Sequence, residues 1–268
     1  AFNKQEGVLM LIAGYQLWKV LAICVGVFVA SFVDAIGGGG GLISLPAYMI
    51  AGMPTHIALG TNKLSSCLGT VASTARYIKR GYTDWFLALP SAALSVAGAY
   101  IGTEIQLMVN DRVLRYMLIV VLIVVAAVML EEKHFPETQG EMERWKRCAI
   151  VCAASLIIGI YDGFYGPGTG TFLLIVYCKL AKMDLRTASG NMKIVNLASS
   201  FGAMVTSLAA GMVNVPIGLA ASVFAFAGQY LGAGMMIKNG TKVVTPVIFV
   251  VLGLLAAKLG LELFGIAV

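Results

Sequence analysis

The chain contains long stretches without any charged side chain, and the longest of them covers residues 194–237. A helix needs about 20 apolar residues to cross the hydrocarbon core of a bilayer. This stretch is therefore long enough for two membrane spans joined by a tight turn at residues 211–214. Residues 85–103 and 116–130 are also uncharged. A soluble helical bundle needs a polar face on each helix. These segments have none, so we expect an all-α polytopic membrane protein.

The overall composition agrees with a membrane protein and argues against other classes. Only 12% of the residues are charged, about half of what a soluble domain carries. The net charge of +6 would suit nucleic-acid binding, but the basic residues are scattered through short loops, as in membrane proteins. We therefore expect a lipid bilayer and no nucleic acid as partner. Five cysteines without a CxxC pair and only two histidines predict no metal site and no cofactor.

The two halves of the chain share landmarks in the same order. The matched pairs, at offsets of 128 to 130 residues, are Asp34 and Asp162, Asn62 and Asn191, Lys63 and Lys193, and the motifs Gly98-x-x-x-Gly102 and Gly228-x-x-x-Gly232. Such internal similarity indicates a duplicated structural unit. We expect a first five-helix repeat at residues 1–130, a charged cytoplasmic linker at 131–146, and a second five-helix repeat at 147–268.

Each half contains five apolar segments. They cover residues 18–36, 42–53, 58–78, 85–108 and 113–130 in the first half, and residues 147–163, 170–181, 188–210, 214–237 and 243–265 in the second. The second segment of each half has only about a dozen residues and follows a glycine-rich break. It is either a half-helix that does not cross, which gives four crossings per half, or part of a crossing, which gives five.

The distribution of Lys and Arg favours five crossings per half. With five, twelve basic residues lie in loops on one face, and only Lys4, Arg112 and Arg115 lie on the other. With four, the same charges divide almost evenly, whereas membrane proteins concentrate Lys and Arg on the cytoplasmic side. We therefore expect about ten transmembrane helices with both termini outside. Because five is odd, the second repeat must be inverted relative to the first.

Two glycine-rich breaks, Gly37–Gly41 and Gly166–Gly170, interrupt the apolar sequence. Unwound backbone inside a membrane is tolerated only where it is buried in protein or lines a cavity. A matched pair of such breaks is the best sequence indication of a secondary transporter's substrate site. We expect the backbone N–H groups after each break to bind an anion, and close helix packing is the alternative. The candidate ligands are Gly39, Gly40, Gly41, Gly168, Thr169 and Gly170.

Lys63 and Lys193 each fall about five residues inside an apolar segment. A lysine within the membrane is costly unless it is paired or faces a cavity. We interpret the two lysines as cationic anchors for an oxyanion. One alternative is neutralisation within each half, with Lys63 paired to Asp34 and Lys193 paired to Asp162. The other is that each ammonium group reaches a nearby interface.

Other polar residues are weaker candidates. Asn62 and Asn191, with Thr61, would donate hydrogen bonds to the substrate, or would bond between helices instead. Asp34 and Asp162 would carry protons for coupling, or would simply cap the broken helices and neutralise the lysines. Asn196, Ser65 and Ser66 are expected to be packing residues.

Several of these motifs resemble those of one transporter family over nearly the whole chain. They are Phe32–Gly37 with its glycine run and Pro46, Ala58–Leu64 with Arg76-Tyr77, Asp162–Gly170, and Asn191–Ser199. Together they resemble the TauE/SafE family, also called the sulfite exporter or toluene-sulfonate uptake permease superfamily. The resemblance implies an inner-membrane transporter of small organosulfur anions such as sulfite, sulfoacetate or other sulfonates.

The resulting hypothesis is a secondary transporter that binds a small sulfur oxyanion near the midplane and works by alternating access. The alternatives are a passive anion channel and a transporter of another small organic anion. An intramembrane enzyme would need a nucleophile with a base, or metal ligands. Neither His56 nor His134 lies within an expected span, so we predict no catalytic residues.

Overall fold

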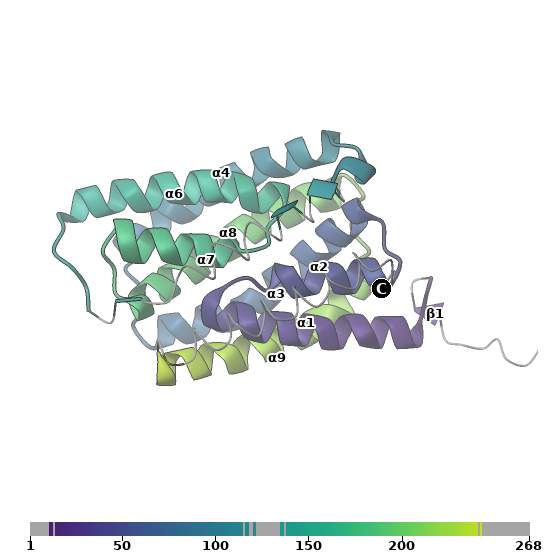
Figure 1. Ribbon diagram of the computed structural model, residues 1–268, viewed down its shortest axis with the longest axis horizontal. Helices are drawn as coiled ribbons and strands as arrows, with labels where there is room; N and C mark the ends of the chain where they lie inside the picture. Colours follow the sequence, from purple (N-terminus) through teal and green to yellow (C-terminus); the bar gives the residue numbers. More distant parts are fainter. Residues whose placement is uncertain are drawn as a thin grey trace, which may run out of the picture.

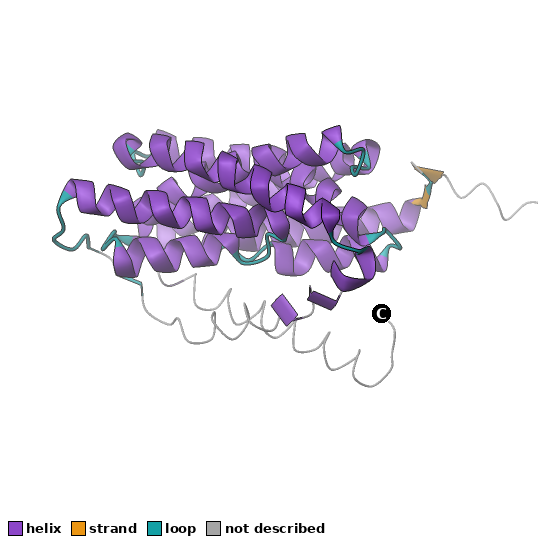
Figure 2. Ribbon diagram, turned by 90° about the horizontal axis from the view of Figure 1, so that it is seen from above, coloured by secondary structure: helices purple, strands orange, loops and turns teal. Residues whose placement is uncertain are grey.

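The computed structural model describes residues 11–12, 14–114, 116–117, 120–121, 135–136, 138–240 and 242. The helices are α1 (Leu17–Gly37), α2 (Gly41–Ile50), α3 (Thr55–Lys79), α4 (Trp85–Met108), α6 (Arg144–Phe164), α7 (Thr169–Ile175), the π-helix η1 (Val176–Leu180), α8 (Leu185–Ala209) and α9 (Val215–Asn239). A two-residue hairpin of β1 (Leu11–Ile12) and β2 (Tyr15–Gln16) precedes them. The predicted all-α class is confirmed for the long elements, which lie side by side along one axis (Figure 2).

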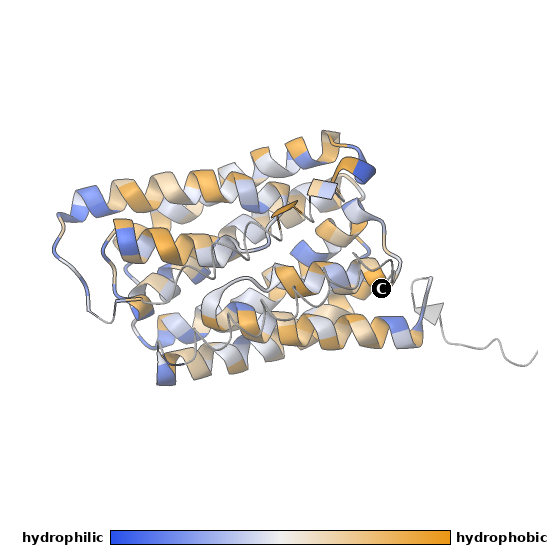
Figure 3. Cartoon of the chain, in the orientation of Figure 1, coloured by the Kyte–Doolittle hydropathy of each residue, from blue (hydrophilic) through white to orange (hydrophobic). Residues whose placement is uncertain are grey.

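The helix boundaries agree with the hydropathy of the sequence. Eight of the ten expected segments correspond to helices, and the other two, residues 113–130 and 243–265, lie largely outside the described residues. The linker ends earlier than expected, because α6 already begins at Arg144. Its first turn carries basic side chains that stand at the end of the bundle, where hydrophilic residues gather (Figure 3). The expected apolar segment therefore begins at residue 147, although the helix begins three residues earlier, at Arg144.

Five of the described helices, α1, α4, α6, α8 and α9, are long and apolar enough to cross a membrane. Helix α3 has 25 residues but falls outside this group, because its buried face carries hydroxyl, amide and ammonium groups. Helix α2 has ten residues, about 15 Å of rise, which is half of a bilayer core. Helices α2 and α7 are thus half-helices that follow the two glycine-rich breaks.

Each half-helix runs back beside the helix that precedes it. The Lys19 ammonium near the beginning of α1 donates a hydrogen bond to the carbonyl oxygen of Ala51, just after α2, at 3.2 Å. In the second half, Nε of Arg147 near the beginning of α6 donates to the carbonyl oxygen of Ala181, just after η1, at 2.9 Å. The chain therefore returns to the end of the bundle where α1 or α6 began, which is the path that the loop charges favour.

The helical hairpins α1–α2 and α6–α7 enter the bundle from opposite ends. Helix α1 begins next to the β-hairpin, and α6 begins at the far end (Figure 1). There the Arg144 guanidinium lies 3.2 Å from the carboxylate of Asp84, which follows α3. The ten-helix inverted repeat extends beyond the described residues and stays a prediction.

Small residues allow the two halves to interlock. Helix α4 of the first half packs along α6 of the second, and α9 of the second packs along α1 of the first. A Cβ atom added to Gly102 would overlap the carbonyl oxygen of Ile160, and one added to Gly232 would overlap that of Phe32. The two Gly-x-x-x-Gly motifs are therefore packing motifs, as predicted, because only glycine permits this backbone approach.

Helices α3 and α8 form the polar centre of the bundle. They pack against each other and each also contacts α9 or α4 of the opposite half. The Thr74 hydroxyl on α3 donates to the carbonyl oxygen of Lys193 on α8 at 3.2 Å, and the Ser95 hydroxyl on α4 donates to that of Val195 at 3.0 Å. Such interhelical hydrogen bonds stabilise helix contacts in a membrane, where water is absent.

We expect Gly102→Val to destabilise the protein, because the added side chain has to push α4 away from the backbone of α6. Overpacking of this kind typically costs about 1–3 kcal/mol. The measurement is the thermal unfolding temperature of the purified protein in detergent. Ala97→Val is the control, since Ala97 lies on the exposed face of α4. Equal unfolding temperatures for the two variants would contradict the packing role of Gly102.

Candidate functional site

The two glycine-rich breaks contact each other in the middle of the bundle. The Thr171 hydroxyl donates to the carbonyl oxygen of Gly37 at 3.0 Å, and a Cβ atom added to Gly41 would lie 2.9 Å from Cα of Pro167. Gly38 and Gly168 both have positive φ, 78° and 82°, a backbone conformation that glycine adopts without strain. Glycine is thus required here both for the turn and for the close contact between the breaks.

Two buried ion pairs flank this contact, and both connect the two halves of the chain. The Lys63 ammonium on α3 lies 2.8 Å from Oδ1 of Asp162 on α6. The Lys193 ammonium on α8 lies 2.7 Å from Oδ2 of Asp34 on α1. The predicted neutralisation of lysine by aspartate is therefore observed, but the predicted partners within each half are wrong. The reason is that the helices of the two halves interlock, so each lysine faces the break of the other half.

The alternative that the lysines reach an interface is also wrong. The side chain of Lys193 is fully buried and that of Lys63 is 7% exposed. Both ammonium groups end at a carboxylate inside the bundle. Each lysine is thus neutralised within the protein instead of at a lipid headgroup.

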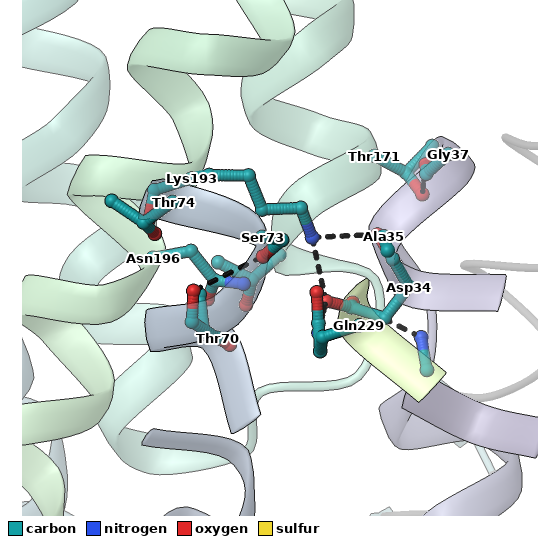
Figure 4. A network of polar contacts seen from close by, with 12 residues as sticks. Asp34, Ala35, Gly37, Thr70, Ser73, Thr74, Thr171, Lys193, Asn196 and Gln229 are labelled. Atoms are coloured by element: carbon teal, nitrogen blue, oxygen red, sulfur yellow. Dashed lines mark hydrogen bonds and ion pairs between the residues drawn. The ribbon is translucent and has the colours of Figure 1, made fainter. Parts of the chain in front are cut away.

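Both carboxylate oxygens of Asp34 accept hydrogen bonds (Figure 4). Its Oδ2 accepts hydrogen bonds from the Lys193 ammonium and from Nε2 of Gln229 at 2.8 Å, and its Oδ1 accepts from the backbone N–H of Gly40 at 3.3 Å. Lys193 also donates to the backbone carbonyl of Asp34 at 2.6 Å. The carboxylate therefore lies at the beginning of α2, where the helix dipole favours negative charge.

Asp162 has fewer donors, although it occupies the equivalent position. Its Oδ1 accepts from the Thr169 hydroxyl at 2.8 Å and from Lys63. Its Oδ2 is buried and has no hydrogen-bond partner among the described residues. At the offset of 130 residues, Ala99 stands where Gln229 serves Asp34. The two ion pairs are therefore chemically unequal.

These contacts revise the expectation for the breaks. We expected the N–H groups after each break to be open to an anion from solution. Instead, the carboxylate of Asp34 bonds the N–H of Gly40, and Asp162 bonds the first residue of α7, Thr169. Asp34 thus caps the beginning of α2, as the alternative interpretation proposed, whereas Asp162 bonds only the Thr169 hydroxyl and caps no backbone N–H of α7. An incoming anion has to compete with a carboxylate of the protein.

A small polar cavity of about 30 Å³ lies where the breaks meet the central helices. Its lining includes Asn62, Lys63 and Ser66 on α3, Asn196 and Ser200 on α8, and Thr169. A second cavity of about 30 Å³ shares Asp34, Gly41, Asn62 and Ser66 with it and continues to Gln229. Each has room for one or two water molecules. In the described part of the chain, no three His, Cys, Asp or Glu side chains gather to hold a metal ion.

The cavities contain some of the predicted site residues but not all. Lining residues among the candidates are Asn62, Lys63, Gly40, Gly41, Thr169, Gly170, Asp34 and Asp162. Asn191 instead donates to the carbonyl oxygen of Thr187 in its own helix at 2.8 Å, and the Thr61 hydroxyl accepts from the N–H of Asn214 at 2.9 Å. Direct ligand roles for Lys193, Asn191, Thr61, Gly39 and Gly168 stay predictions.

Three residues that line the first cavity were not among the predicted ligands. Ser66 and Asn196 were expected to be packing residues, and Ser200 was not considered. The sequence did contain a signal for them. Ser66 and Asn196 are 130 residues apart, and Ser200 follows Asn196 by four, so the two α8 side chains share one helix face.

Comparisons with known proteins identify the family of the chain. The family model described as "Sulfite exporter TauE/SafE" matches residues 22–259. The chain belongs to the TauE/SafE family. It is 34% identical to the "Probable membrane transporter protein ORF9" of Sinorhizobium sp, over 88% of this chain and 90% of that protein. It is 31% identical to the "Probable membrane transporter protein YfcA" of Escherichia coli K12, over 91% and 92%. No solved structure matches the chain.

Membership of the TauE/SafE family makes the protein a membrane transporter and not an enzyme. The apolar helices indicate that it passes through the membrane several times. The half-helices and ion pairs are therefore parts of a transporter.

The crossed ion pairs predict a specific pattern of mutational coupling. Lys193→Met leaves the Asp34 carboxylate buried without its cation, which costs about 3–5 kcal/mol. Adding Asp34→Asn removes that charge, and we expect it to restore most of the stability. Adding Asp162→Asn instead leaves Lys63 unpaired and should lower stability further. Unfolding in detergent measures all variants, and rescue by Asp162→Asn would show that the pairs are not crossed.

Proposed function

We propose that this TauE/SafE transporter carries a small sulfur-containing anion, such as sulfite, sulfoacetate or a related sulfonate, across the inner membrane. The observation that carries the proposal is the Lys63 ammonium at the wall of a polar cavity between the two breaks. The family description supports the sulfur chemistry. The chain binds its substrate in this cavity, near the bilayer midplane.

The chemistry of the cavity suits an oxyanion with several acceptor oxygens. Lys63 supplies a positive charge, and Asn62, Ser66, Asn196 and Ser200 supply amide and hydroxyl groups that replace the hydration shell. Hydrogen bonds between a charged group and its partner are about twice as strong as neutral ones. A sulfonate or sulfite group can accept from several of these donors at once, whereas a cation would be repelled by Lys63.

The small volume of the cavity supports alternating access over a channel. About 30 Å³ holds water but leaves no room for a sulfonate, so the bundle must open for substrate to enter. We propose that the two half-helix hairpins, which enter from opposite ends of the bundle, open the site to one face at a time. This motion belongs to a ten-helix inverted repeat with both termini outside. A passive channel needs a continuous path through weak sites.

Transport in proteoliposomes tests the proposal. We expect counterflow of labelled sulfite or sulfoacetate with the native protein and at least a tenfold loss with Lys63→Gln, because the charge that attracts the anion is gone. Ser200→Ala should raise KM several-fold, about 1 kcal/mol for a lost hydrogen bond. Ser222→Ala is the matched control, since this buried hydroxyl bonds within α9. Folded native protein without flux of any sulfur anion would refute the proposal.

The inverted arrangement predicts which face each loop occupies. Arg80 and Ala210 are equivalent at the offset of 130 residues, and both are exposed. We expect a single cysteine at position 80 to react with membrane-impermeant reagents from the cytoplasm, and one at position 210 to react from the outside. The background is a variant lacking the five native cysteines that keeps its transport. Labelling of both positions from the same face would rule out inversion.

A further inference from the structure

We propose that Asp162 carries a proton together with the anion. The Lys63–Asp162 ion pair then opens in each transport cycle and is called the exchange pair, whereas the Lys193–Asp34 ion pair stays closed and is called the structural pair. The inference rests on the proposed function and assigns its coupling ion. It starts from the inequality of two ion pairs that occupy equivalent places in the two halves.

The contacts of the carboxylates separate the two pairs. Asp162 is 2% exposed, and its Oδ2 has no hydrogen-bond partner in the described part of the chain. The Thr169 hydroxyl that serves its Oδ1 also lies 2.8 Å from the carbonyl oxygen of Gly166, and a single hydroxyl proton cannot serve both. A buried carboxylate with an unsatisfied oxygen is an acceptor ready for a proton.

The structural pair, Lys193–Asp34, has more hydrogen bonds, and its ammonium group does not line the cavity. Asp34 accepts from Gln229 and Gly40 in addition to Lys193. The Lys193 ammonium also bonds the backbone carbonyl of Asp34, is fully buried, and does not line the cavity. An anion in the cavity reaches Lys63 but not Lys193. Only the Lys63–Asp162 pair can therefore be opened by substrate.

The exchange step balances in charge. Before binding, the Lys63 ammonium neutralises the Asp162 carboxylate. A singly charged anion replaces Oδ1 of Asp162 at the ammonium, which leaves a second negative charge buried beside the first. Oδ2 of Asp162 then takes a proton from cavity water connected to bulk solvent, and an O–H bond forms. The loaded site is again neutral, and release on the other face returns the proton and restores the pair. One proton thus moves with each singly charged anion.

Among the described residues, none beside Asp162 supplies a second cation that could replace Lys63. From α4, Ala99, Gly102 and Thr103 pack on this part of α6, and the Thr103 hydroxyl donates to the carbonyl oxygen of Gly163. From α7 comes Thr169, and across the cavity lies Asp34, already paired with Lys193. On α6 itself, Tyr161 donates its hydroxyl proton to the carbonyl oxygen of Pro167, and Tyr165, just after α6, is a phenol and not a cationic side chain. Protonation is the remaining way to neutralise Asp162.

Infrared spectroscopy tests the assignment without any substrate. Lys63→Met imitates the loss of the ammonium to an anion, and it should produce a protonated-carboxyl band at neutral pH that the native protein lacks. The band should vanish in Lys63→Met/Asp162→Asn and persist in Lys63→Met/Asp34→Asn. Absence of the band in folded Lys63→Met, or its loss only with Asp34→Asn, would overturn the proposal. If Lys63→Met does not fold, the same band is sought in native protein titrated with methanesulfonate.

Transport gives a second readout that separates this inference from the proposed function. Methanesulfonate stays ionised at all pH values used and brings no proton of its own. In native proteoliposomes, a gradient of one pH unit should accumulate it up to about tenfold, the ratio of proton concentrations. In Asp162→Asn, whatever exchange remains should no longer respond to the pH gradient, so methanesulfonate should not accumulate. Exchange that is equally pH-driven in Asp162→Asn refutes the proton role alone. Native protein with no flux of any sulfur anion refutes the proposed function, and the infrared result still decides Asp162.

Discussion

The arrangement of this transporter depends on neutralising two lysines that lie buried inside the bundle, away from bulk water. An uncompensated charge at this depth is prohibitive, so each lysine must meet a carboxylate. Lys63 meets Asp162, and Lys193 meets Asp34. Because each pair joins one half of the chain to the other, neither half can bury its charges alone. The ion pairs, together with the glycine contacts between α4 and α6 and between α1 and α9, hold the two halves in one register.

This constraint also explains why the helices break where they do. A continuous α1 or α6 would leave its aspartate in the middle of a helix, with all nearby N–H groups already bonded. The positive-φ glycines release the backbone, and α2 and α7 then begin beside the carboxylates of Asp34 and Asp162. The carboxylate of the protein occupies the place that suits an anion, next to Lys63 and the polar side chains of α3 and α8. Substrate binding then becomes an exchange of one anion for another, which fits a site that must both load and release.

Much of the fold could be predicted because its signals are local. Apolar segments gave the helix boundaries to within a few residues, and the runs at Gly37–Gly41 and Gly166–Gly170 placed both breaks. The Gly-x-x-x-Gly motifs predicted close packing, since a missing Cβ is visible in the sequence. Neutralisation of lysine by aspartate was foreseen only as the alternative to anion anchoring, and with the wrong partners. The lining residue Ser200 could be inferred only from its spacing of four residues from Asn196, because that spacing alone does not distinguish a cavity wall from a packed helix face.

Hydropathy, glycine placement and the duplicated motifs are properties of short segments, and so the sequence by itself determined where the helices, half-helices and breaks lie. The choice of partners was decided only by the tertiary structure. Asp34 and Asp162 are chemically the same, and either could neutralise either lysine. Which one does so depends on which helix faces meet between segments that lie 99 or 159 residues apart in the chain. The inequality of the two pairs arises in the same way, because Gln229 approaches Asp34 only when α9 packs on α1, and Ala99 on α4 brings no equivalent donor to Asp162.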